Sequence, residues 1–194
     1  MEISQLETIL MLSLLTLWAG LLFGGFALGS FNAAGTHRIP TPARMGSSLV
    51  LATAAWLWAL INPDADQSTL AILLATGMAL GLTGDLFMAQ LLPVKDYVLA
   101  GMGAFGLGHI AYIAGLVTHG DILNDPSYQW GAPLAWLIIA VIGWFIVVYL
   151  GGKRGEGVSV LHIAALPYAL LLATTAGIAT GLALQSDVFV PLAV

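Results

Sequence analysis

Residues 70–92 have the sequence LAILLATGMALGLTGDLFMAQLL, and residues 97–117 have the sequence YVLAGMGAFGLGHIAYIAGLV. Each run is long enough to cross a bilayer, because about 20 apolar residues in a helix match the hydrocarbon layer. The first run carries Asp85 and the second carries His109. Ionisable groups inside such spans are costly to insert and usually have a function. The two runs therefore predict a membrane protein with a polar pair inside it.

The composition of the whole chain also predicts a polytopic membrane protein. Of its 194 residues, 59% are hydrophobic and 8% are charged, whereas about 25% are charged in an average soluble domain. The apolar stretches lack the charged stripe of a soluble amphipathic helix. A net charge of −5, with no basic run, argues against nucleic-acid binding. The absence of cysteine excludes disulfides and thiolate chemistry.

Six complete spans are expected from the apolar stretches. We place them near residues 7–31, 46–62, 69–92, 97–118, 131–150 and 158–184. The connections between them are short, which predicts a single all-α transmembrane bundle over residues 1–194. A seventh apolar run begins at Val188, and its seven residues would rise only about 10 Å as a helix. We therefore expect the chain to be truncated at its C-terminus.

Charged residues divide between alternate loops. The basic ones fall in the first, third and fifth connections, and they are Arg38, Arg44, Lys95, Lys153 and Arg154. Acidic residues gather at the opposite ends of the spans. Because basic loops stay in the cytoplasm, this pattern predicts that the N-terminus faces outward. The compact loops favour a bacterial inner membrane.

Asp85 is the first candidate site residue. Gly77, Gly81 and Asp85 follow each other at four-residue spacing and therefore share one helix face. Small residues at this spacing let another helix approach closely, which predicts that Asp85 points into the bundle. Removal from water favours the protonated acid, which can serve as a general acid. The alternative is an interhelical hydrogen bond or ion pair that only holds the bundle together.

His109 lies on the next span, where Phe105 and Tyr112 share its helix face. The short connection predicts that this span and the preceding one are antiparallel neighbours. Counted from the loop, the Cα depths of His109 and Asp85 differ by about 9 Å, which side chains and one water could span. A lone histidine is usually structural, but the pairing with Asp85 favours a functional interpretation. A metal site with His162 has no dense ligand cluster to support it, so we expect no metal.

Two motifs resemble those of a known family. Gly84-Asp85 stands near the end of the third span, and Gly103-Ala-Phe-Gly-Leu-Gly-His109-Ile-Ala-Tyr112 lies in the fourth. In order and spacing they resemble the hallmarks of the YhhN / TMEM86 family of multi-pass membrane proteins. Members of the family carry eight helices. They also carry a Lys-Pro pair at the start of the second helix, and this chain has Thr41-Pro42-Ala-Arg44 at the corresponding place. They also carry a Ser-Asp motif late in the seventh helix. Ser186-Asp187 precedes that helix, so we expect the second acidic residue beyond Val194.

The resemblance implies a lysoplasmalogenase. Such an ether hydrolase cleaves the vinyl ether bond of lysoplasmenyl-ethanolamine or -choline, giving a fatty aldehyde and a glycerophospho-base. It implies a lysophospholipid substrate within membrane lipid, and no cofactor is expected. The expected site residues are Asp85, His109 and Tyr112 for catalysis and Arg44, Phe105 and Gly84 for substrate binding.

Two other classes of function stay open. The chain could be a small proton-coupled transporter in which Asp85 and His109 form a relay. The lack of a visible internal repeat, and of proline-broken helices around the polar pair, argues against a transporter. The chain could instead be a structural scaffold with a buried polar clasp, in which case loss of the carboxylate would change stability alone. Association into a homo-oligomer also stays open.

Overall fold

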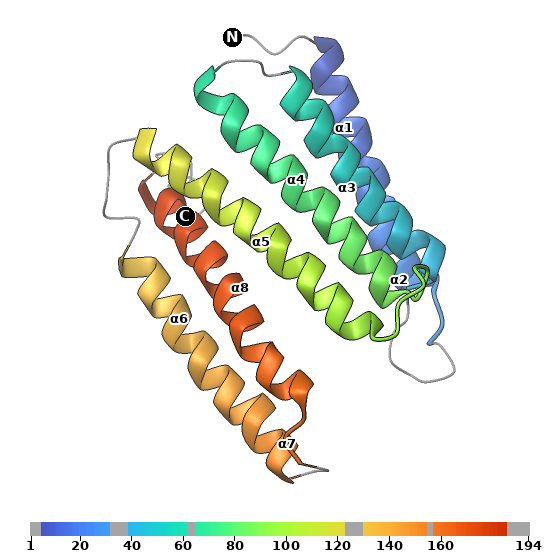
Figure 1. The fold of residues 1–194 in the computed structure, drawn as a ribbon. Helices are drawn as coiled ribbons and strands as arrows, with labels where there is room; N and C mark the ends of the chain where they lie inside the picture. The colour runs from blue at the N-terminus through green and yellow to red at the C-terminus, as the bar shows by residue number, and fades with distance from the viewer. Residues whose placement is uncertain (1–4, 32–38, 62–64, 123–129, 155–156, 186–194) are drawn as a thin grey trace.

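The computed structural model describes residues 5–31, 39–61, 65–122, 130–154 and 157–185, and these residues are helical apart from short connections (Figure 1). The elements in chain order are α1 (Gln5–Ala19), η1 (Gly20–Gly24), α2 (Gly25–Leu28), α3 (Thr41–Ile61), α4 (Ala65–Met88), α5 (Tyr97–Ile122), α6 (Gly131–Gly143), η3 (Trp144–Tyr149), α7 (Leu150–Arg154) and α8 (Val160–Gln185). The π-turns η1 and η3 lie within continuous helices, so α1 to α2 form one span and α6 to α7 form another.

Six helices among the described residues are long and apolar enough to cross a membrane. This confirms the expected all-α architecture and an integral multi-pass membrane protein. Neighbouring spans pack in the order α1, α3, α4, α5, α8, α6, so α8 passes between α5 and α6 (Figure 1). One end of the bundle carries three basic residues and is here called the basic end. They are Arg44 at the start of α3, Lys95 just before α5 and Lys153 at the end of α7. The apolar run that begins at Val188 lies outside the described residues.

Small residues make up most of the interior of this bundle among the described residues, with Ile178 and Leu182 of α8 as buried exceptions. Ala71 and Ala75 are completely buried on α4, and Ala52 and Ala104 are nearly so. Large apolar side chains face outward instead, as Val147 does with 72% of its surface exposed. In lipid, where apolar surface gains nothing from burial, helices associate by close packing of small residues. This distribution is therefore typical of a membrane protein.

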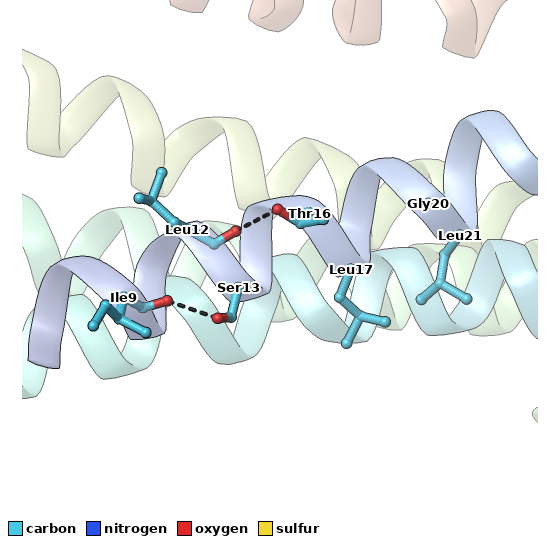
Figure 2. A pocket seen from close by; sticks show the side chains of 7 residues that line it. All are labelled: Ile9, Leu12, Ser13, Thr16, Leu17, Gly20 and Leu21. Carbon is cyan, nitrogen blue, oxygen red and sulfur yellow. Dashed lines mark hydrogen bonds between the residues drawn. The ribbon is translucent and has the colours of Figure 1, made fainter.

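The N-terminal span shows how polar groups are satisfied on the lipid-facing surface. A shallow hollow of about 670 Å³ follows one side of the span, lined by Ile9, Leu12, Ser13, Thr16, Leu17, Gly20 and Leu21 (Figure 2). The Ser13 hydroxyl donates to the Ile9 carbonyl at 2.7 Å, and the Thr16 hydroxyl donates to the Leu12 carbonyl at 2.8 Å (Figure 2). Each hydroxyl proton is thus bonded within the helix, as an apolar surrounding requires.

The ends of two helices differ from the expected positions. Helix α3 begins at Thr41, five residues earlier than expected, because Pro42 is well tolerated in a first helical turn. Helix α4 ends at Met88 instead of residue 92, because Gln90 adopts a left-handed conformation with φ of 58°. The Leu91 N–H then donates to the Leu86 carbonyl at 3.0 Å, which closes a Schellman turn.

The early end of α4 changes the position of Asp85 along the membrane normal. Asp85 lies in the last turn of α4, about 4.5 Å of helix rise before Met88. Because the helix ends at Met88 and not at residue 92, Asp85 lies four residues closer to the end of its span than the predicted bounds imply. After the turn, Asp96 caps α5 by accepting the Leu99 N–H on Oδ1 at 3.0 Å. Helices α4 and α5 run antiparallel and pack closely, as the short connection predicts.

Candidate functional site

Two aromatic residues of α5 fit into two glycine notches of α4. A Cβ atom placed on Gly84 would lie 2.8 Å from the Phe105 ring, and one on Gly77 would lie 2.1 Å from the Tyr112 ring. The two glycines are seven residues apart, as are the two aromatic residues, so the antiparallel helices meet in register. Phe105 and Tyr112 therefore hold α5 against α4.

Gly81 has a different environment from the one expected. Apart from its chain neighbours and its own helix backbone, no described atom lies within 4 Å of the position that its Cβ would occupy. The expectation that Gly77, Gly81 and Asp85 form one close helix contact is wrong at Gly81, because α5 meets α4 along Gly77 and Gly84 instead. Gly81 leaves open space one turn from Asp85 on the same side of α4.

Asp85 is bonded to the neighbouring helix α3. The Ser48 hydroxyl donates a hydrogen bond to Asp85 Oδ2. Ser48 also lies 3.3 Å from the Arg44 carbonyl, and Ser47 donates to that carbonyl at 2.8 Å. The bond to Oδ2 therefore orients the carboxyl group. Oδ1 is the oxygen that could donate a proton to a bound molecule or accept one from it.

Arg44 lies one turn before Ser48, in the first turn of α3. Its Nε is buried and has no hydrogen-bond partner within the part of the chain that the structure describes. A buried N–H group without an acceptor costs about 1–3 kcal/mol, and more when the group is charged. An anion such as a phosphate would supply that acceptor, because a guanidinium group binds phosphate oxygens well. Arg44 and Asp85 are thus brought to the same end of the bundle, at the start of α3 and the end of α4.

His109 faces α8 across the side of α5. Its Nδ1 lies 3.1 Å from the Thr175 Oγ1. Its ring meets the Tyr112 ring edge to face at a centroid separation of 5.6 Å, and the Tyr168 ring at 6.1 Å. Asp85 and His109 share no direct hydrogen bond among the described residues.

Sequence reasoning missed three residues of this site. They are Ser48 on α3 and Tyr168 and Thr175 on α8. A usable signal was present, because each is a polar residue inside a long apolar span. Pro167 stands next to Tyr168 inside α8, and the helix continues unbroken through it to Gln185. This proline therefore does not contradict the expectation that proline breaks no helix around the polar pair.

His162 is not part of this cluster. It lies near the start of α8, where its Nδ1 accepts the Ser159 N–H at 3.0 Å and lies 2.7 Å from the Ser159 hydroxyl. Its ring packs against Gly152 of α7. Within the described residues, no group of three or more histidine, cysteine, aspartate or glutamate side chains could hold a metal ion. His162 thus lies apart from Asp85 and His109 in the part of the chain that the structure describes.

Comparisons with known proteins identify a family. A model of the YhhN family matches residues 41–194, which begin at the first residue of α3 and include both sequence motifs. The resemblance found in the sequence is thereby confirmed. No curated protein matches the chain, and no solved structure matches it either.

Proposed function

We propose, from the premise that the chain belongs to the YhhN family, that it is a membrane-embedded hydrolase of lysoplasmalogens. The substrate is lysoplasmenyl-ethanolamine or -choline, and the products are a fatty aldehyde and a glycerophospho-base. The observation that carries the proposal is the position of Asp85 in the last turn of α4, at the same end of the bundle as the buried Nε of Arg44, which has no hydrogen-bond partner among the described residues.

Depth in the membrane favours this substrate. In a lysoplasmalogen, the vinyl ether joins the alkyl chain to glycerol, so the reactive bond lies at the boundary between the apolar chain and the polar head. Asp85 lies at the matching level, at the end of a span and not at its centre. Arg44 at the same end of the bundle supplies a cation for the phosphate, which lies a few bonds farther toward water.

The first chemical step is protonation of the vinyl ether. Asp85 donates the proton on Oδ1 to the β-carbon while Ser48 holds Oδ2. The electron pair of the carbon–carbon double bond forms the new C–H bond, and the ether oxygen shares the positive charge in an oxocarbenium ion. The resulting carboxylate lies beside the cation and stabilises it.

The second step is the capture of the cation by water. His109 Nε2 accepts a proton from the water, whose oxygen bonds to the cationic carbon to give a hemiacetal. The hemiacetal collapses when its hydroxyl proton passes to the Asp85 carboxylate and the glycerol oxygen takes the proton from His109. The aldehyde and the alcohol leave, and both side chains regain their starting states. Tyr112 and Tyr168 flank the imidazole and orient it for this exchange.

The test measures fatty aldehyde released from lysoplasmenyl-ethanolamine by membranes that contain the full-length protein. The ester-linked lysolipid serves as the control substrate. Asp85→Asn should abolish aldehyde release, while Asp96→Asn, which alters an exposed carboxylate in the connection to α5, should retain it. Normal turnover by a well-expressed Asp85→Asn variant would remove Asp85 from the acid role. No aldehyde from the unaltered protein would overturn the proposed activity.

A proton-coupled carrier is the second candidate. The ionisable residues Asp85 and His109 on membrane-spanning helices favour it, because such residues form proton relays in transporters. Helix α8, however, continues unbroken through Pro167, whereas interrupted helices form the substrate sites of many transporters. Such sites lie near the middle of the bilayer, and Asp85 at the end of α4 does not match that level. Flux of a lysolipid into proteoliposomes without bond cleavage would favour the carrier.

A further inference from the structure

Thr175 on α8 makes two contacts through one hydroxyl group. Its Oγ1 donates to the Leu171 carbonyl at 3.0 Å, one turn earlier in the same helix. The same oxygen lies 3.1 Å from His109 Nδ1 on α5. A threonine hydroxyl has a single proton, and a carbonyl oxygen has none to give. When the hydroxyl proton is bonded to the Leu171 carbonyl, the contact with His109 needs a proton on Nδ1.

The same pattern of hydroxyl donation recurs through the protein. Thr76, Thr83, Thr118 and Thr174 each donate to the carbonyl four residues earlier, at 2.8 to 2.9 Å. In an apolar surrounding this bond satisfies the hydroxyl without another helix. Thr175 differs from these residues because its lone pairs face an imidazole of the neighbouring helix.

We propose that Thr175 is a positioning residue that holds neutral His109 as the Nδ1–H tautomer, which leaves an unshared electron pair on Nε2. The tautomer of a histidine is set by the partner of its other ring nitrogen. The T-shaped contacts with the Tyr112 and Tyr168 rings fix the plane of the imidazole, so Nε2 has a defined direction. The consequence for catalysis rests on the proposed function, because the pair on Nε2 is the base that accepts a proton from water.

Nitrogen NMR of the full-length protein, labelled with ¹⁵N-histidine in detergent micelles, reports the tautomer directly. Comparison with His109→Gln assigns the signals. His162 serves as an internal reference, because its Nδ1 accepts the Ser159 N–H and it therefore carries its neutral-form proton on Nε2. We expect the opposite pattern for His109, with the proton on Nδ1.

Three threonine variants separate positioning from folding. Thr175→Val keeps the shape of the side chain and removes the acceptor, so His109 should shift toward a mixture of tautomers. Thr175→Ser should restore the Nδ1–H form. Thr174→Val removes an equivalent hydroxyl bond from the adjacent residue, which has no contact with His109 among the described interactions, and should leave the tautomer unchanged.

Turnover gives the second readout. Thr175→Val should lower kcat about 10- to 100-fold with little change in KM, by analogy with the range seen when a group that orients a metal-binding histidine is lost. Thr175→Ser should recover most of it. An Nε2–H tautomer in the unaltered protein, or an unchanged Nδ1–H tautomer in Thr175→Val, would overturn the inference. The NMR result does not need aldehyde release, so failure of the proposed activity and failure of the positioning role are told apart.

Discussion

Gly77 should be one of the least replaceable residues of α4. In Gly77→Ala the new Cβ would lie 2.1 Å from Tyr112 Cε1, 2.5 Å from Cδ1 and 2.7 Å from Cζ. Ordinary contacts of this kind begin at 3.4 Å, so the Tyr112 ring must move by about 1.3 Å, the difference between 3.4 and 2.1 Å. Such overpacking usually costs about 1–3 kcal/mol. The Tyr112 ring cannot move freely, because it also makes a T-shaped contact with the His109 ring.

Gly81→Ala is the matched control, one turn farther along the same helix. Its Cβ meets no atom outside its own helix within 4 Å, so the free energy of unfolding should stay within about 1 kcal/mol of that of the unaltered protein. Any change should be an increase, because alanine is more stable than glycine inside a helix. At about 2–4 °C per kcal/mol for a chain of this length, Gly77→Ala should lower Tm by several degrees. Gly81→Ala should not lower Tm.

Thermal unfolding in detergent, followed by the fluorescence of the six tryptophans, measures both variants. The double variant Gly77→Ala with Tyr112→Leu removes the rigid ring that causes the clash. Its stability loss should therefore be smaller than the sum of the two single losses. Equal Tm values for Gly77→Ala and Gly81→Ala, or strictly additive losses in the double variant, would refute the notch between Gly77 and Tyr112.

Three further predictions concern the two turns and the head-group region at the basic end. Asp96→Ala should lose the N-cap of α5 and about 1 kcal/mol of stability by thermal unfolding, whereas Lys95→Ala should be neutral. Gln90→Gly should raise the free energy of unfolding by about 1 kcal/mol, because glycine adopts the left-handed conformation without steric cost, and Gln90→Ala should not. Arg44→Gln should raise KM for a lysophospholipid more than it lowers kcat; an unchanged KM would separate Arg44 from the phosphate.

The sequence was sufficient to predict the spans, because their length and hydrophobicity are local properties of the chain. The helix ends were less accurate. Gln90 ends α4 through a left-handed conformation that glycine usually adopts, and the apolar Leu91 and Leu92 conceal the end. Local spacing also predicted a helix contact at Gly81 that the structure does not show. Spacing defines which residues share a helix face, but it does not tell which face the neighbouring helix covers.

The site could be predicted only in part for a related reason. Asp85 and His109 stood out as ionisable groups in apolar runs, and the structure places each beside a polar partner. The partners Ser48 and Thr175 come from helices 37 and 66 residues away in the chain. Hydroxyl residues are common in membrane helices, where they satisfy their own backbone. Only the packing of α3 on α4 and of α8 on α5 selects the two that serve the site.

The position of Asp85 in the last turn of α4 also bears on how water and product would move. The proposed hydrolysis consumes one water molecule and releases a polar glycerophospho-base. At the centre of a bilayer, both would have to pass several turns of apolar helix. Asp85 lies about 4.5 Å of helix rise from the end of its span, so water would enter and the polar product would leave at the same face of the membrane, while the fatty aldehyde would stay in the lipid.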